Sequence, residues 1–232
     1  MGTSSTDDAA AAFEDAPASA YDVWLFDLDG TLVDTEWSYT REVFDRVGDR
    51  IGREFTDREA EILWHGLGGS RNEQLREWGL TPPAFWDAFH DVEDPAARAD
   101  ATYLFEDAEH VADIDAPVGV VTHCAEFLAE PVMENLDIAD WFDVVLCCDD
   151  DTGWKPDPRP LELALADVGA DPSQHAGVYV GDAESDMGAA ANAGLDGVHV
   201  ERHEPGMRGH CVLGDRRVDT FDVLFSQSAA SD

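Results

Sequence analysis

Short apolar runs recur along the chain with amphipathic stretches between them, and this alternation restricts the folds open to it. The runs cover residues 21–26, 118–121, 143–147, 177–180 and 197–200. The stretches between the later runs have helical periodicity, at Cys124–Leu136, Pro160–Val168 and Ser185–Ala193, with Gly194 placed as a C-cap. Near-continuous apolar strands that alternate with helices predict an α/β fold, a Rossmann-like parallel sheet covered by helices on both faces.

The segment from residue 36 to residue 112 has a different pattern, without a strand-like run. Amphipathic patterns predict helices at Ser38–Val47, Asp57–His65, Arg71–Trp78, Pro82–Phe89 and Pro95–His110. The sequence therefore predicts three parts: a disordered acidic tail over 1–20, a core formed by 21–35 and 113–232, and an all-helical cap over 36–112 that is inserted after the first strand.

The charge balance is extreme, because 51 acidic residues face 14 basic ones and the formal net charge is −37. Such a charge repels nucleic acid and anionic membranes, so neither is expected as a partner. A hydrophobic content of 44% argues for a folded chain rather than a disordered one. Self-repulsion of this size is tolerated best in concentrated salt, which predicts a halophilic source.

The four cysteines show no CxxC spacing, which favours small buried thiols over a disulfide framework or a metal site. The histidines at 199, 203 and 210 with Cys211 form a loose group whose spacing matches no standard zinc site. The chain has neither a signal-peptide pattern nor an apolar run of about 20 residues. We therefore expect a soluble cytoplasmic protein.

Polar groups stand where the predicted strands end. The first strand leads to Asp27 and Asp29, the second to Thr122, and the fourth to the acidic segment that begins at Asp182. Ligands of open α/β sheets bind outside the carboxyl ends of the strands. Carboxylates gathered there repel one another unless a cation offsets them, and oxygen ligands favour Mg²⁺. An ionised carboxylate beside Mg²⁺ can attack phosphorus and form an acyl phosphate.

Lys155 is the only lysine of the chain, since the other 13 of the 14 basic residues are arginines. It lies in the loop after the third strand, between Trp154 and Pro156. A compact ammonium group suits a crowded pocket of oxygen atoms better than a planar guanidinium. This position predicts a catalytic cation rather than a chance surface lysine.

These segments resemble the four motifs of the haloacid dehalogenase superfamily, in the family's order. They are DLDGTLVDT at Asp27–Thr35, Thr122 after a strand, Lys155-Pro156, and GDAESD at Gly181–Asp186. The helical insert resembles the family's C1-type cap, and the likeness covers about residues 21–225. The resemblance implies a fold of a capped α/β core.

The resemblance also implies a role for each motif residue. Asp27 would be the nucleophile, and Asp29 would protonate the leaving oxygen and later activate water. The carboxylates of Asp27 and Asp182 and the backbone carbonyl of Asp29 would hold Mg²⁺, and Asp186 would support the metal or Lys155. Thr122 would bind a phosphoryl oxygen, and Lys155 would offset the charge of Asp27 and the phosphoryl group.

Two further residues are candidates for substrate binding. Gly68-Gly69-Ser70-Arg71 resembles the G-x-S-R stretch of mutase-like and phosphoglycolate-phosphatase-like relatives, in which the arginine contacts substrate. A salt bridge to cap carboxylates is the alternative for Arg71. His123 takes the place of the Asn, Ser or Gly that many relatives have after the Thr or Ser, and either faces the substrate or caps the following helix.

The presence of Asp29 favours a phosphoryl-transfer enzyme over a dehalogenase, because dehalogenases of the superfamily lack this second aspartate. The prediction is a Mg²⁺-dependent phosphatase that hydrolyses a small phosphorylated metabolite through an aspartyl-phosphate. A β-phosphoglucomutase-like enzyme and a non-catalytic phosphate-binding member are the alternatives. A response-regulator receiver also has acidic strand ends with Thr and Lys, but it is much shorter and carries no cap. The sequence leaves monomer and homodimer open.

Overall fold

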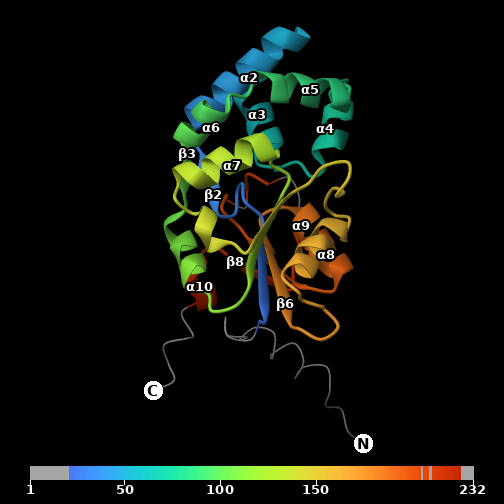
Figure 1. Cartoon of the computed structure of the whole chain (residues 1–232). Helices are drawn as coiled ribbons and strands as arrows, with labels where there is room; N and C mark the ends of the chain where they lie inside the picture. Colours follow the sequence, from blue (N-terminus) through green and yellow to red (C-terminus); the bar gives the residue numbers. More distant parts are fainter. Residues whose placement is uncertain (1–20, 205, 209–210, 226–232) are drawn as a thin grey trace, which may run out of the picture.

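The computed structural model describes residues 21–204, 206–208 and 211–225. Six strands of this part form one sheet in which every neighbouring pair is parallel (Figure 1). In spatial order they are β5 (Val144–Cys147), β4 (Val118–Thr122), β1 (Val23–Phe26), β6 (Gly177–Gly181), β7 (Asp196–Val200) and β8 (Arg216–Val218). The five predicted strands are confirmed, and β8 is an addition. Its sequence, Arg-Arg-Val, is too short and too charged to resemble a buried strand.

The sheet is covered on both faces because its central strands alternate their side chains between two cores. In β1, Trp24 and Phe26 join one core, whereas Val23 and Leu25 join the other. The first core includes side chains of α7 (Glu126–Asn135), the 3-10 helix η2 (Glu106–Asp113) and α10 (Asp222–Phe225). The second includes α8 (Arg159–Asp167) and α9 (Glu184–Ala193). The 3-10 helix η3 (Ala139–Trp141) follows α7.

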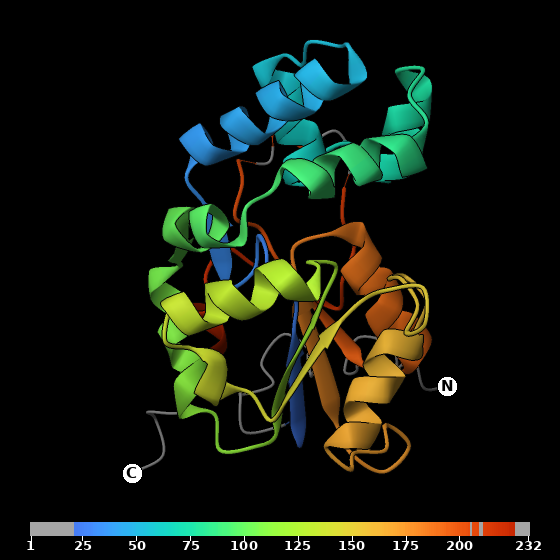
Figure 2. The same cartoon turned by 45° about the horizontal axis from the view of Figure 1, so that its top comes forward.

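Four helices form a separate layer beyond the carboxyl ends of the strands (Figure 2). They are α2 (Trp37–Ile51), α3 (Asp57–Trp64), α4 (Arg71–Glu77) and α5 (Pro82–Val92). Their apolar faces close around a third core, in which Phe44, Phe55 and Phe85 are buried. These helices match the predicted ones, and the layer is hereafter called the cap. The domain boundaries at 36 and 112 stay predictions.

The predicted helix over Pro95–His110 is wrong in its middle. The chain forms α6 (Pro95–Ala101), then the strand β3 (Thr102–Leu104), then η2. β3 pairs antiparallel with β2 (Val33–Thr35), so a two-stranded ribbon joins the cap to the core. The helical spacing continues through this segment, but tertiary pairing with β2 overrides it. The insert is therefore not all-helical.

The predicted tail over 1–20 lies outside the described residues. The four cysteines are free; Cys148 is buried and Cys124 and Cys147 are half-buried, but Cys211 is exposed, so the prediction of buried thiols is wrong for it. Within the described ranges, the helices are all too short or too polar to cross a bilayer.

Candidate active site

A cavity of about 140 Å³ lies where the cap meets the carboxyl ends of the strands. The core lines it with predicted site residues, which are Asp27, Asp29, Thr122, His123, Lys155, Asp182 and Asp186. The cap adds apolar and aromatic side chains, among them Leu63, Trp64, Trp86 and Phe89. Arg71 also lines the cavity, so every residue proposed from the sequence is adjacent to one space.

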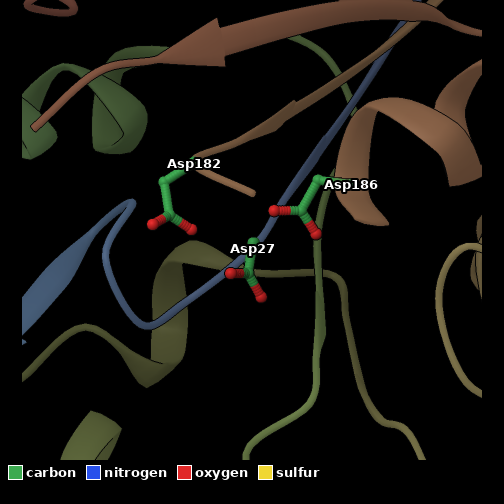
Figure 3. A group of neighbouring side chains, drawn as sticks. All are labelled: Asp27, Asp182 and Asp186. Carbon is green, nitrogen blue, oxygen red and sulfur yellow. The ribbon is translucent and has the colours of Figure 1, made fainter. Parts of the chain in front are cut away.

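Three aspartates form the floor of this cavity. Asp27 follows β1, Asp182 follows β6 and Asp186 lies in the first turn of α9. Each offers a carboxylate oxygen within 4.8 Å of the others, and Figure 3 shows the carboxylates turned toward a shared space. Elsewhere in the described ranges, His, Cys, Asp and Glu side chains form no other group of three that could hold a metal ion.

Two glycines let these side chains approach. Gly30 has a φ of 78°, and a Cβ there would lie 2.6 Å from an oxygen of Asp182. A Cβ at Gly181 would lie 2.5 Å from the side chain of Asp186. Contacts this short are not tolerated, so glycine is required at both positions. The close packing of the carboxylates is thus built into the two motifs that carry them.

The carboxylates are buried, and this changes their protonation. Burial raises the pKa of Asp27 to about 6, although the ammonium of Lys155 opposes the shift. Burial and the negative charges of Asp186 and Asp27 raise the pKa of Asp182 well above its usual value. A cluster in this state gains from a bound cation, because the cation removes the penalty for ionising all three groups.

Lys155 is 5% exposed and binds the cluster directly. Its Nζ lies 2.8 Å from Oδ1 of Asp27 and 2.8 Å from Oδ1 of Asp186. It also donates to the carbonyl of Val121 at 3.1 Å and to the hydroxyl of Tyr179 at 2.9 Å. Burial disfavours the charge, but Asp186 and Asp27 outweigh it and raise the pKa of Lys155. The only lysine therefore stays charged beside the proposed nucleophile.

Both carboxylate oxygens of Asp186 have partners within the protein, and one of these partners is Lys155. Its Oδ2 accepts from the backbone N–H of Ala183 at 2.9 Å, while its Oδ1 meets the ammonium. Tyr179 completes this arrangement, since its hydroxyl donates to the Val121 carbonyl at 2.7 Å. The sequence does not predict this role of Tyr179, whose only signal is a hydroxyl within an otherwise apolar strand.

Asp29 lies at the cavity wall with a side chain that is 37% exposed, outside the three-carboxylate group. Its Oδ1 accepts a hydrogen bond from Nη2 of Arg98, which is itself 4% exposed. The sequence does not predict this contact, because Arg98 belongs to no motif and lies 69 residues away from Asp29 along the chain.

Thr122 ends β4 at the cavity, and His123 follows it. The Thr122 hydroxyl, on a residue 1% exposed, accepts from the backbone N–H of Cys124 at 3.0 Å, which leaves its own proton for a ligand. The His123 ring lies 5.6 Å from the ring of Trp154, and its Nε2 has no partner among the described residues. Burial and the charges of Lys155 and Arg71 lower the pKa of His123 well below its usual value, so the imidazole is neutral.

Arg71 is the first residue of α4, but its guanidinium binds backbone carbonyls at the C-terminal end of α3. Nε donates to the carbonyl of Leu63 at 2.6 Å, and Nη2 donates to the carbonyl of Trp64 at 2.9 Å. These carbonyls end α3, where a cation is favoured. The salt bridge to cap carboxylates that was the alternative for Arg71 is not among the ion pairs of the described residues.

His199 and His203 contact other groups of the protein rather than each other. His199 lies 3.0 Å from the carbonyl of Asp182, behind the cluster. The ring of His203 packs 4.3 Å from that of His65 in the cap. His210 lies outside the described residues, so the predicted absence of a zinc site there stays a prediction.

The haloacid dehalogenase-like hydrolase family matches residues 24–200. Phosphoglycolate phosphatase of Shigella dysenteriae is 32% identical over 203 residues, which cover 75% of this chain and 78% of that protein. Phosphoglycolate phosphatase of Escherichia coli K12 is 30% identical over 207 residues, with the same shares. The chain belongs to the haloacid dehalogenase-like hydrolase family.

Solved structures share the fold. A protein from Lactobacillus plantarum superposes with a TM-score of 0.72 at 24% identity, over 88% of this chain and 98% of that one. An HAD phosphatase from Thermococcus onnurineus has a TM-score of 0.65 at 23% identity, over 90% and 99% of the two chains. The predicted α/β fold and the family resemblance are confirmed.

Proposed function

We propose that this chain is a Mg²⁺-dependent phosphatase that hydrolyses a small phosphate monoester through an aspartyl-phosphate. One observation carries the proposal: Asp27, buried at the end of β1, is paired with the only lysine, and Asp29 stands two residues on at the wall of the same cavity. The phosphoric monoester hydrolases among its relatives support this reaction class.

The carboxylate group fits a hard cation, because three buried oxygen donors lie within 4.8 Å of one another. Asp27, Asp182 and the backbone carbonyl of Asp29 would hold Mg²⁺, with Asp186 in support through Lys155. When bound, the ion would offset the charge of the phosphoryl group during transfer.

The residues then divide the reaction into two steps. An oxygen of Asp27 bonds to phosphorus as the bond from phosphorus to the ester oxygen breaks, and Asp29 gives its proton to that oxygen. In the second step Asp29 takes a proton from water while the water oxygen attacks phosphorus, and the acyl phosphate bond to Asp27 breaks. Lys155 and the Thr122 hydroxyl stabilise the phosphoryl oxygens in both steps.

The leaving group would face the cap. Arg71 and the aromatic side chains of the cap line the cavity, and His123 lines it from the core. We propose Arg71 and His123 as substrate contacts, with His123 acting as a neutral hydrogen-bonding group. A cavity of about 140 Å³ suits a small metabolite, and the relatives make 2-phosphoglycolate the first ester to test.

The test is phosphate release from a panel of monoesters in molar KCl, with Mg²⁺ or with EDTA. We expect Mg²⁺-dependent release by the wild type and a loss of about 10³-fold or more in Asp27→Asn. Asp49→Asn, which changes an exposed carboxylate of α2, is the matched control and should keep full activity. A folded wild type that releases no phosphate from any ester, or an Asp27→Asn variant that retains activity, would overturn the proposal.

A further inference from the structure

Arg98 is a buried cation at the junction of cap and core. It belongs to α6, the short helix between the last cap helix and β3. The side-chain amide of Asn135 in α7 donates to the carbonyl of Ala99 at 3.0 Å, which fastens α6 to the core. The hydroxyl of Thr102 donates to the carbonyl of Arg98 at 2.7 Å and fixes the helix end. The backbone that carries Arg98 is therefore rigid.

The guanidinium contacts both parts of the molecule. On the core side, Nη2 donates to Oδ1 of Asp29. On the cap side, the Trp64 ring lies over the guanidinium, 4.7 Å from its central carbon. Trp64 is the last residue of α3, so this contact exists only while the cap lies against the core.

The Asp29 side chain has few other restraints. The backbone of Asp29 is held by its bridge to Val33, but its carboxylate is 37% exposed at the cavity wall. A carboxylate in that position rotates freely unless a partner fixes it, and general acid–base chemistry depends on alignment to a fraction of an ångström. Arg98 is the partner that fixes it.

The alternative is that Arg98 and Asp29 form an ion pair that only stabilises the fold. Burying a charge costs desolvation free energy, which an ion pair repays only when its geometry is good and its remaining polar groups are hydrogen-bonded. Here only the arginine is buried, at 4% exposure, and the carboxylate faces the cavity. In addition, Nε of Arg98 is buried without a partner among the described residues, a cost that no packing argument explains. The arrangement favours Asp29 alignment over stability.

We propose that Arg98 is a positioning residue that aligns Asp29 for proton transfer and makes this alignment depend on the closed cap through Trp64. The inference rests on the proposed function, in which Asp29 is the general acid and base. Arg98 does not contact the transferred phosphoryl group; it acts through Asp29 alone.

A double-mutant cycle with Asp29→Asn tests the proposal. We expect Arg98→Gln to lower kcat about 10- to 100-fold with KM changed less than about threefold, since general acid–base catalysis contributes roughly 10²–10⁴-fold. In the Asp29→Asn background, Arg98→Gln should lower kcat by less than about threefold. Equal losses in the two backgrounds would overturn the proposal, because Arg98 would then act independently of Asp29.

An ester with a good leaving group gives a second readout. p-Nitrophenyl phosphate needs no proton for its first step, so the burst of nitrophenolate should stay as fast in Arg98→Gln as in the wild type. The steady state should slow, because water activation still needs Asp29. A burst that slows as much as the steady state would count against the proposal.

Three further variants control for folding and for the cap contact. Arg50→Gln breaks an exposed ion pair with Asp91 on the cap and should leave kcat unchanged. Arg98→Lys keeps the charge and should restore part of the lost kcat. Trp64→Leu should lower kcat in the same direction, by about three- to tenfold. If Arg98→Gln does not fold, Arg98→Lys and Trp64→Leu enter the same cycle, and losses of equal size in the wild-type and Asp29→Asn backgrounds would overturn the proposal.

The two levels of proposal fail in different ways. A wild type without Mg²⁺-dependent phosphate release contradicts the phosphatase itself. An active wild type that loses kcat in Asp29→Asn, but shows additive losses with Arg98→Gln, contradicts only the role of Arg98.

Discussion

At the scale of single residues, Lys155 shows how one cation organises a site. The sequence marks it as the only lysine, and the structure gives its ammonium four oxygen partners on Asp27, Asp186, Tyr179 and the Val121 carbonyl. Partners converge from several directions, which suits a compact ammonium and not a planar fork. The prediction of its position at the nucleophile agrees with this geometry, although its catalytic role remains a proposal.

Lys155→Met should lower the free energy of unfolding by about 3–5 kcal/mol at neutral pH, because it leaves two buried carboxylates without their cation. Urea unfolding in fixed KCl with EDTA measures this loss, since a bound metal would mask it. Lys155→Arg should lose at least about 100-fold in kcat, since the guanidinium does not fit the four partners. Arg159→Met, an exposed cation four residues on, is the control; an equal loss in it would contradict the assignment.

The raised pKa of Glu93 predicts that the stability of the folded protein depends on pH. Burial raises its pKa from 4.5 to about 7, although Arg98 opposes the shift. The folded state then binds more protons than the unfolded state between these values, so stability falls as pH rises from about 4.5 to about 7. Glu93→Gln removes this effect. Between pH 4.5 and pH 8, the wild type should lose about 1–3 kcal/mol more than the variant in urea unfolding; parallel losses would contradict this.

At the scale of elements, α3 is fixed by side chains at both ends. Thr56 and Glu59 form a capping box at its start, a signature that is readable in the sequence. Arg71 holds the last carbonyls from outside the helix. The position of Arg71 at the start of α4 looks electrostatically unfavourable in the sequence, but the guanidinium actually lies at the favourable end of α3.

Arg71→Gln should therefore lower the free energy of unfolding by about 1–3 kcal/mol, because two carbonyls lose charged donors. Urea unfolding measures this, with Arg76→Gln, an exposed arginine of α4, as the matched control. A rise in KM with the same variant would support the proposed substrate contact. Unchanged stability would contradict the capping role.

At the scale of the whole molecule, the net charge of −37 dominates. Basic side chains are scarce, and three of them, Arg98, Lys155 and Arg208, are buried in the interior. The solvated surface is left with little positive charge to offset its carboxylates. Repulsion of this kind is screened when the Debye length shortens from about 10 Å at 0.1 M salt to about 3 Å at 1 M.

The thermal midpoint should consequently rise between 0.1 and 1 M KCl by roughly 4–8 °C, equivalent to about 2 kcal/mol for a chain of this size. Circular dichroism at both salt concentrations measures it. NaCl at the same ionic strength should give the same rise, since screening depends on ionic strength and not on the identity of the monovalent cation. An unchanged midpoint would contradict the electrostatic argument and the predicted halophilic source.

The sequence by itself determined five strands of the main sheet and the residues at their ends. Apolar runs are local signals, and parallel strands bring their carboxyl ends to one edge, so Asp27, Thr122 and Asp182 could be placed together without coordinates. The cap helices could be predicted for the same reason, since their amphipathic periods are local.

Only the tertiary structure decided the order of strands, the break at Thr102, and the partners of Asp29 and Arg71. Thr102 pairs with Thr35, and Asp29 meets Arg98 from 69 residues away. Neither contact leaves a periodic or motif signal in the chain. Such contacts form between segments that are far apart in the sequence and meet only in the folded protein. Their free energy therefore cannot be inferred from the pattern of either segment alone.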